Sequence, residues 1–422
     1  MTEGKATSLK KQSMCRQRHL PLDVELRCIK CDSAGTVILR KKDIYCDNCF
    51  FAATNHKFRA CIGKNKIITN NAKVLLCLSG GAASTVLLDL VYNGISLDVH
   101  KKLRIIPLII NVADASNCSV SDLVKMQCEK YKLDGYFINI SDYLKKDAIL
   151  PKCNQVPNED KELNEEFQAL LKSMPSTARN DFLNKVKRNL FIKYAKVLQC
   201  NYVFTAETTS TLAINLLSSL AIGRGSQVEN DIGFIDSRDV KVKILRPMKD
   251  ISKEELDYYI KLKKLAPVDL KDVKGNSLQT AISCFVTELQ ENFQSTISAV
   301  CRTADKIGVA DDNNECKKCT ICEVSTYHRP TIFSLLQYSH HYKVQTIKFS
   351  WLNKTKNNLS ALDATIFSRT LSHGNLHRNG ANDETLFPYI DKHLCYSCSR
   401  NYSEMKNTSP HLHNIIQESL DQ

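Results

Sequence analysis

Residues 73–84, KVLLCLSGGAAS, carry the strongest fold signal in the chain. The run KVLLCL is apolar enough for a buried strand, and Ser79, Gly80 and Gly81 follow it directly. The apolar run 86–91 then predicts a helix. A glycine turn between a strand and a helix presents backbone N–H groups to an anion, and the helix N-terminus adds its dipole. The pattern therefore predicts a phosphate-binding loop. The alternative is that the glycines only allow the strand and the helix to pack closely.

Strand and helix patterns alternate downstream of this turn. Further strands are expected at 103–112, 135–140 and 201–206. Further helices are expected at 178–199, 210–222 and 253–264. Pro107 predicts a bulge in its strand, and Ser252 with Glu255 predicts a capping box for the last helix. This order predicts an α/β fold with a parallel sheet covered by helices on both faces.

Composition restricts the class of protein. The chain has 422 residues, of which 43% are hydrophobic and 24% are charged, and this balance excludes fibrous and fully disordered proteins. No apolar run reaches the roughly 18 residues that cross a bilayer. The first 20 residues lack the apolar segment of a secretory signal. We therefore expect a protein of the cytosol or nucleus without a membrane partner.

Nine of the 18 cysteines have CxxC spacing. This spacing lets two thiolates of one turn bind the same metal ion, whereas a reducing compartment disfavours disulfides. Fourteen residues with a strand-like run and a polar turn separate the pair Cys28 and Cys31 from the pair Cys46 and Cys49. The arrangement predicts a zinc ribbon, and the competing interpretation is a set of free core cysteines.

Five more cysteines form a second cluster. Cys316, Cys319 and Cys322 occur together, and Cys395 and Cys398 follow after 72 residues. Two groups across a long insertion favour a second zinc site, although iron–sulfur clusters also use closely spaced cysteines. Five thiols exceed a four-ligand site by one, so the spacing leaves open which four bind.

Basic residues are concentrated near the N-terminus. The formal net charge is +13, and residues 1–73 contain 15 basic and 6 acidic side chains. Such a surplus suits a polyanion, usually nucleic acid, with a solvated basic face as the alternative. The expected contacts are Arg40, Lys41, Lys42, Lys57, Arg59, Lys64 and Lys66.

These patterns divide the chain into three predicted parts. Residues 1–65 form a basic zinc-ribbon module, and 66–266 form the α/β domain. Residues 267–422 form a more helical region that carries the second cysteine cluster and a polar insertion at 353–386.

The turn at 79–84 resembles the SGGxxS loop of the PP-loop ATP pyrophosphatase family. Within it, nearly the whole chain is similar to the cytoplasmic tRNA 2-thiolation protein 2 family. The similarity also rests on the N-terminal cysteine module, LAINLLSSLAIGRG (212–225), RPMKDISKEEL (246–256) and the terminal CYSC.

The resemblance implies a PP-loop fold and a function in a cytoplasmic tRNA sulfurtransferase complex. It implies 2-thiolation of the wobble uridine, at position 34, in the cytosolic tRNAs for lysine, glutamate and glutamine. It further implies a catalytic PP-loop paralogue as partner, tRNA binding, and sulfur from a thiocarboxylated ubiquitin-like carrier.

The chain departs from catalytic members of the family. Those members usually read SGGxDS, often with Lys at x, where this chain has Ala82 and Ala83. The carboxylate would help to hold Mg²⁺, and the lysine would neutralise phosphate charge. The HNADD sequence of active relatives is replaced by TAETT at 205–209. We therefore expect no catalytic residue here, and the sequence leaves ATP and Mg²⁺ binding open.

The cysteines of the α/β domain also depart from catalytic relatives, which carry a CxxC pair and a further cysteine there. Cys118, Cys128, Cys153 and Cys200 form no such pair and are predicted to be small buried hydrophobic residues. The expected nucleotide contacts of the degenerate loop are Ser79, Gly80, Gly81 and Ser84.

Two other functions stay open. The chain could be a self-sufficient PP-loop ATP-dependent tRNA-modifying enzyme, which ATP turnover by the chain alone would support. It could instead be a zinc-containing nucleic-acid-binding factor without a modification role. Normal wobble thiolation in cells that lack the protein would favour that second alternative.

Overall fold

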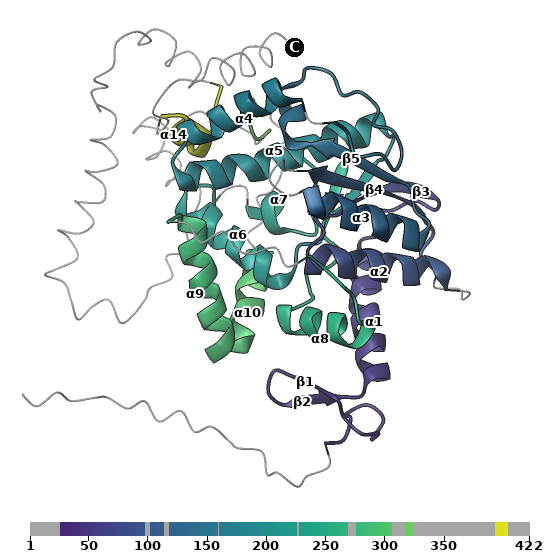
Figure 1. The fold of residues 1–422 in the computed structure, drawn as a ribbon. Helices are drawn as coiled ribbons and strands as arrows, with labels where there is room; N and C mark the ends of the chain where they lie inside the picture. Colours follow the sequence, from purple (N-terminus) through teal and green to yellow (C-terminus); the bar gives the residue numbers. More distant parts are fainter. Residues whose placement is uncertain are drawn as a thin grey trace, which may run out of the picture.

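The centre of the molecule is a six-stranded sheet with the order β5-β4-β3-β6-β8-β7 (Figure 1). The structure is a computed structural model that describes residues 26–97, 102–113, 118–158, 160–225, 228–268, 276–305, 318–323 and 393–403. The strands are β3 (Ala72–Cys77), β4 (Ile105–Ala113), β5 (Gly135–Asn139), β6 (Tyr202–Phe204), β7 (Ile235–Asp236) and β8 (Lys243–Leu245). All neighbours pair in parallel except β7, which is antiparallel to β8. The predicted α/β fold with a parallel sheet is confirmed, and β7 is an antiparallel addition at its edge.

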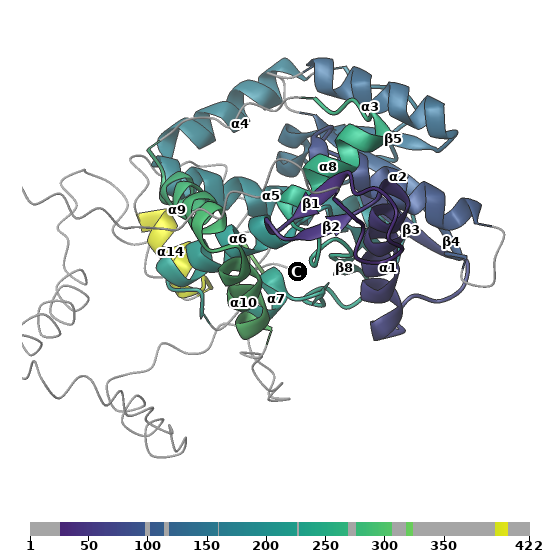
Figure 2. The ribbon, with the colours of Figure 1, turned by 90° about the horizontal axis from the view of Figure 1, so that it is seen from below.

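Helices cover both faces of the sheet (Figures 1 and 2). The helices are α1 (Asp47–Asn65), α2 (Ala82–Ser96), α3 (Cys118–Tyr131), the 3-10 helix η1 (Ile140–Leu144), α4 (Lys161–Ser173), α5 (Ser176–Val197), α6 (Thr209–Ala221), α7 (Val228–Ile232), α8 (Lys253–Lys263), α9 (Leu278–Asn292), α10 (Gln294–Ala304) and α14 (Tyr396–Ser403). Val74 and Leu76 pack on the side of α2, α3 and α8, and Leu75 packs on the side of α4 and α5. Alternate residues of a strand point to opposite faces, and both faces are covered here, which explains why β3 is apolar from Val74 to Cys77.

Most predicted elements agree with the structure within a few residues, and the capping box of Ser252 and Glu255 is present. The bulge predicted at Pro107 is wrong, because β3 and β4 pair without interruption from Ala72 to Cys77. Pairing of β4 with β5 begins only at Ile109. Pro107 thus lies in a part of β4 that has a partner strand on one side only, where a residue without an N–H group is tolerated.

The N-terminal hairpin packs against α8 (Figure 2). β1 (Val37–Leu39) and β2 (Asp43–Tyr45) are antiparallel, as the zinc-ribbon prediction requires, and α1 follows them. The rings of Phe51 and Tyr259 meet edge to face with their centroids 5.3 Å apart. The division of the chain into three parts stays a prediction, and the polar insertion at 353–386 lies outside the described residues. No helix among the described residues is long and apolar enough to cross a membrane.

Candidate metal centres and the degenerate phosphate loop

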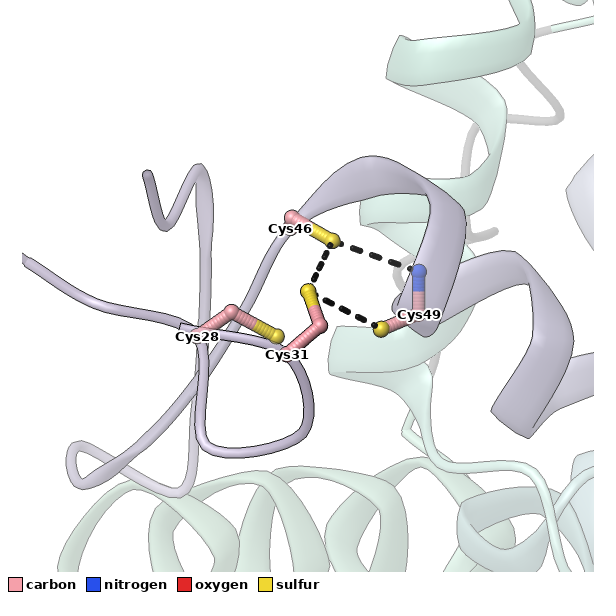
Figure 3. A group of neighbouring side chains, drawn as sticks. All are labelled: Cys28, Cys31, Cys46 and Cys49. Atoms are coloured by element: carbon pink, nitrogen blue, oxygen red, sulfur yellow. Dashed lines mark hydrogen bonds between the residues drawn. The ribbon is translucent and has the colours of Figure 1, made fainter. Parts of the chain in front are cut away.

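The four N-terminal cysteines converge on one point (Figure 3). Cys28 and Cys31 come from the turn before β1, Cys46 is the N-cap of α1, and Cys49 lies in its first turn. Their sulfur atoms all lie within 4.8 Å of one another, and Cys31 Sγ is 3.6 Å from both Cys46 Sγ and Cys49 Sγ. Four thiolates around a tetrahedral zinc ion, each about 2.3 Å from it, stand roughly 3.8 Å apart. The four cysteines therefore fit a single metal ion.

Backbone N–H groups prepare this centre for deprotonated ligands. Burial disfavours the thiolate of Cys28, but N–H groups of the surrounding turn lower the pKa of Cys28 to about 6. The N–H group of Cys49 also points at Cys46 Sγ, at 3.5 Å. Metal binding requires thiolates, so these donors favour the binding form of the site.

Four of the five C-terminal cysteines form a second centre. Cys319, Cys322, Cys395 and Cys398 have their sulfur atoms within 4.8 Å of one another, with Cys322 Sγ 3.6 Å from Cys395 Sγ. The four-ligand set that the spacing left open is thus complete without Cys316, which lies outside the described residues. This centre is more buried than the first, because three of its four cysteines are buried.

Charged side chains from α5 and from the turn after α6 lie beside the second centre. Lys185 donates to Cys398 Sγ (3.0 Å) and pairs with Asp181 Oδ2 (2.6 Å). Arg224 donates to both oxygens of Asp181 at 2.8 Å and to Ser397 Oγ at 3.0 Å. Burial alone would lower the pKa of Lys185, but the neighbouring Cys398 and Asp181 raise it, so the ammonium stays charged.

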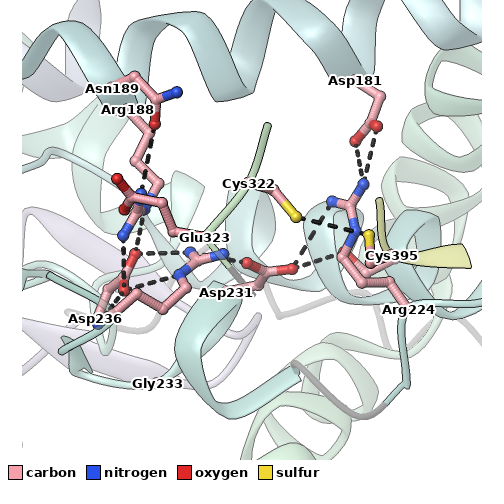
Figure 4. Close-up of polar contacts among 12 residues, drawn as sticks. Asp181, Arg188, Asn189, Arg224, Asp231, Gly233, Asp236, Cys322, Glu323 and Cys395 are labelled. Atoms are coloured by element: carbon pink, nitrogen blue, oxygen red, sulfur yellow. Dashed lines mark hydrogen bonds and ion pairs between the residues drawn. The ribbon is translucent and has the colours of Figure 1, made fainter. Parts of the chain in front are cut away.

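A second group of ion pairs continues from this centre toward β7 (Figure 4). Asp236 accepts from Arg188 Nε (2.7 Å) and from Arg238 Nε (2.9 Å). Arg188 also pairs with Glu323 at 2.7 Å, next to the cysteine ligand Cys322. These contacts fasten the cysteine segment 318–323 to the α/β domain.

The phosphate loop keeps the backbone shape that its glycines predict. Gly80 has a φ of +76°, in the left-handed region that favours glycine, and a Cβ atom there would lie 2.8 Å from Val120. Ser84 Oγ donates to the Gly81 carbonyl at 2.9 Å, and Ser79 Oγ lies 3.3 Å from Ser84 Oγ. Both hydroxyls thus lie at the turn, and the nucleotide contacts of the four loop residues stay a prediction.

The turn carries neither a lysine nor a carboxylate side chain. Ala82 and Ala83 open α2, whose first turn contains no acidic residue. In the TAETT segment, Glu207 accepts from Arg246 Nε (2.7 Å) and from Thr205 Oγ1 (2.8 Å). The segment's carboxylate is therefore already paired with an arginine of the same domain.

A family model described as cytoplasmic tRNA 2-thiolation protein 2 matches residues 277–400 of the chain. A protein of that name from Drosophila melanogaster is 34% identical over 321 residues, which cover 72% of this chain and 78% of the relative. One from Aedes aegypti is 30% identical over 388 residues, covering 88% and 85%. This chain belongs to the cytoplasmic tRNA 2-thiolation protein 2 family. The resemblance found in the sequence is confirmed, and the predicted cytoplasmic location agrees with the relatives' name.

The fold of this family member also has a solved counterpart. The U34-tRNA thiolase NcsA from Methanococcus maripaludis, with its [4Fe-4S] cluster, matches with a TM-score of 0.53 and 17% identity. The match covers 67% of this chain and 88% of that one. At this identity the similarity shows the fold alone, which is the predicted PP-loop fold.

The cysteines of the α/β domain differ in burial in this family member. Cys128 and Cys200 are buried, as predicted. Cys153 is exposed, so its prediction as a buried residue is wrong: it lies in the loop after η1, which runs along the outer edge of β5. The side chain of Cys118 lies outside the described residues.

The basic residues predicted for nucleic acid are in two situations. Exposed side chains belong to Arg40, Lys41, Lys42, Lys64 and Lys66, and Lys57 and Arg59 are half-buried on α1. Lys57 pairs with Glu255 at the N-terminus of α8, and Lys41 Nζ donates to the Glu291 carbonyl (3.2 Å). Lys41 and Lys57 thus also help to dock the N-terminal module, a role that the sequence did not indicate.

Sequence analysis missed the charged residues that pack beside the second cysteine centre and beside the TAETT segment. Asp181 and Lys185 carry no motif, since a charged pair on a helix usually lies in solvent. Arg224 and Arg246 do lie in the segments 212–225 and 246–256, which were noted only for their resemblance. The structure gives each arginine a role: Arg224 pairs with Asp181, and Arg246 pairs with Glu207, inside the domain.

Proposed function

We propose that this chain is a non-catalytic subunit of a heteromeric tRNA sulfurtransferase that 2-thiolates the wobble uridine at position 34. Family membership supports a role in tRNA thiolation. The observation that carries the non-catalytic assignment is the pair Ala82 and Ala83 at the start of α2, in a loop that is otherwise intact. The backbone needed to place a phosphate is kept, and the side chains needed to activate it are gone.

The chemistry of the complex falls to a catalytic PP-loop paralogue. ATP transfers its adenylyl group to the uridine C2 oxygen with release of pyrophosphate, and a sulfur nucleophile then attacks C2 and displaces AMP together with that oxygen. The substrates are the cytosolic tRNAs for lysine, glutamate and glutamine, and the sulfur comes from a thiocarboxylated ubiquitin-like carrier. The pairing of Glu207 with Arg246 supports this division of labour, because this carboxylate is not free for Mg²⁺. The role of this chain is to bind tRNA and to stabilise the paralogue.

Both cysteine centres are proposed to bind zinc. Cys28, Cys31, Cys46 and Cys49 would hold one ion, and Cys319, Cys322, Cys395 and Cys398 the other. An iron–sulfur cubane places each thiolate on a separate iron atom and so spreads the sulfur atoms, whereas here they lie within 4.8 Å. A zinc ion at either centre would cross-link segments of the chain without taking part in the reaction.

Wobble-uridine analysis in cells that lack the protein tests the proposed function. Mass spectrometry of the three tRNAs should find 2-thiouridine lost, and re-expression of the wild-type chain should restore it. An A82G/A83G variant should restore it equally well, because neither alanine side chain contributes to the reaction. Unchanged 2-thiouridine in the deleted cells would contradict the proposal and favour a nucleic-acid-binding factor without a modification role.

The isolated chain is expected to release neither AMP nor pyrophosphate when supplied with ATP and tRNA. The variant A82K/A83D, which restores the side chains of active loops, should still produce no thiolated tRNA, because the domain lacks the relay cysteines. Pyrophosphate release and tRNA mass spectrometry measure the two steps, with the catalytic paralogue as the positive control. Thiolation by the wild-type chain alone would instead identify a self-sufficient enzyme.

Neutralising Arg40, Lys41 and Lys42 to glutamine should weaken tRNA binding by the complex. Each lost phosphate contact reduces the slope of log K against log salt by about 1, so we expect a slope reduced by roughly 2 to 3. The matched control is K130Q/K132Q/K241Q, which removes the same charge from exposed positions elsewhere. If the two triple variants bind tRNA equally well and with equal salt slopes, Arg40, Lys41 and Lys42 form an ordinary solvated surface.

A further inference from the structure

Lys185 is almost fully buried, and one of its two close partners is a sulfur atom. Its residue is 7% exposed, and its ammonium lies 3.0 Å from Cys398 Sγ and 2.6 Å from Asp181 Oδ2. A buried lysine is costly unless anions surround it. Asp181 supplies one carboxylate, which it shares with Arg224, so the remaining close partner of the ammonium is Cys398 Sγ. An ammonium that points at a cysteine of a four-cysteine group has the geometry of a hydrogen bond to a metal ligand.

The charge of a metal centre accounts for such a contact. Four thiolates around one divalent ion carry a net charge of −2, which a buried site must balance. Lys185 and Arg224 bring two positive charges to this side of the centre, and the Asp181 carboxylate, which pairs with both, removes one, so the three groups together offset half of that charge. Groups that hydrogen-bond to metal ligands orient those ligands and tune the affinity for the metal.

The N-terminal centre is built differently. Cys31 is exposed, and its sulfur lies 3.4 Å from the hydroxyl of Ser33. The sulfur of Cys46 receives the backbone N–H of Cys49 instead of an ammonium. Water and backbone dipoles can thus stabilise the thiolates of the N-terminal centre. This centre, which among the described residues has no buried lysine at its cysteines, therefore serves as an internal comparison for the one that Lys185 contacts.

We propose that Lys185 is a positioning residue of the C-terminal metal centre, which orients Cys398 and offsets part of the charge of the cysteine shell. Because Cys398 lies on α14 and Lys185 on α5, this contact also joins the cysteine segment 393–403 to the α/β domain. Asn401 on α14 supports the same junction by donating to Asp181 Oδ2 (2.6 Å). This inference rests on the proposed metal occupancy, and it is independent of the proposed role in tRNA thiolation.

Competition for zinc by a chromophoric chelator tests Lys185 in the full-length chain. In K185M, which keeps the length of the side chain but not its charge, the C-terminal ion should bind 10- to 100-fold more weakly. The N-terminal ion of the same molecule should be unaffected and serves as the internal control. The titration is repeated in a C46S background, which removes the N-terminal ion. The phase of chelator binding that remains then belongs to the C-terminal ion. The K185R variant keeps the charge and should recover most of the affinity.

Lys193 supplies a matched control on the same helix. Its ammonium donates to the Lys145 carbonyl, so K193M removes a half-buried charge of α5 that does not contact the cysteines. K193M should bind both ions as the wild type does. If K185M does not fold, K185Q replaces it, because the glutamine amide can still donate to Asp181 Oδ2 without carrying a charge, while Asp181 keeps its pair with Arg224. Wild-type affinity of the C-terminal ion in K185M or K185Q, or a wild-type chain without an ion at this centre, would overturn the proposal.

Discussion

Replacing Cys46 with serine is expected to release one metal ion per chain and to open the N-terminal hairpin. β1 and β2 have three residues each, and an isolated two-stranded hairpin of this size is marginal in water. Structural zinc supplies on the order of 10 kcal/mol in small modules, so its loss exceeds what the hairpin can replace. Serine is itself a good N-cap, so C46S removes the metal ligand while α1 keeps its start.

Metal analysis and hydrogen exchange measure this change. The zinc content should fall from two ions to one, and the amides that close the hairpin should lose protection, among them Thr36 N–H, which donates to the Tyr45 carbonyl, and Lys42 N–H, which donates to the Leu39 carbonyl. Amides within α1 should stay protected. The control C153S changes an exposed cysteine outside both centres and should keep two ions. A C46S chain that retains two ions and a protected hairpin would refute a metal-dependent module.

Replacing Asp236 with alanine should produce the largest loss of stability among single changes outside the metal centres. The residue is 1% exposed and receives hydrogen bonds from Arg188 and Arg238. Removing one partner of a buried ion pair costs about 3–5 kcal/mol, because the remaining charges stay buried without compensation. Urea unfolding should register this difference. The control D305A breaks the more exposed pair with Lys249 and should cost less than about 1 kcal/mol.

The pairing of Asp236 with the two arginines also predicts that the free energy of unfolding depends on pH. Burial alone would raise the pKa of Asp236, but the two arginines lower it well below its ordinary value. A carboxyl group with a depressed pKa stabilises the fold above its unfolded pKa, near 4, and loses this contribution as the pH falls toward its folded value. The stability difference between wild type and D236N should therefore be full at pH 7 and shrink below about pH 4. A difference that is constant down to pH 2 would show that Asp236 acts by packing alone.

The elements that sequence analysis predicted best are those whose residues carry their own signal. Val74, Leu75 and Leu76 are apolar in a row because each is buried against one face or the other. Gly80 is recognisable because its left-handed backbone and its close neighbours both exclude a side chain. The paired CxxC spacings indicated both cysteine groups for a similar reason, since a four-thiolate shell needs local pairs of ligands.

The features that sequence analysis missed depend on contacts between residues that are far apart in the sequence. The sequence analysis predicts no helix within the zinc-ribbon module, although Phe50, Thr54, Phe58 and Ile62 of α1 follow a helical spacing and are all buried. This stripe includes a polar residue, and its burial depends on packing by α8 and by the hairpin. The contact of Lys185 with Cys398 joins residues 213 positions apart, which no local pattern reveals. The choice of four ligands among five cysteines likewise needed the folded arrangement.

The second cysteine centre has a topological consequence for the chain. Cys322 and Cys395 enclose 72 residues in the sequence, yet their sulfur atoms are 3.6 Å apart. The centre therefore closes a long loop at its base, and both ends of that loop pack against the same helix, α5. Doubling the length of a closed loop adds only about 0.6 kcal/mol of closure entropy. Evolution can thus lengthen, shorten or exchange the enclosed segment while the sheet and the phosphate loop stay as they are.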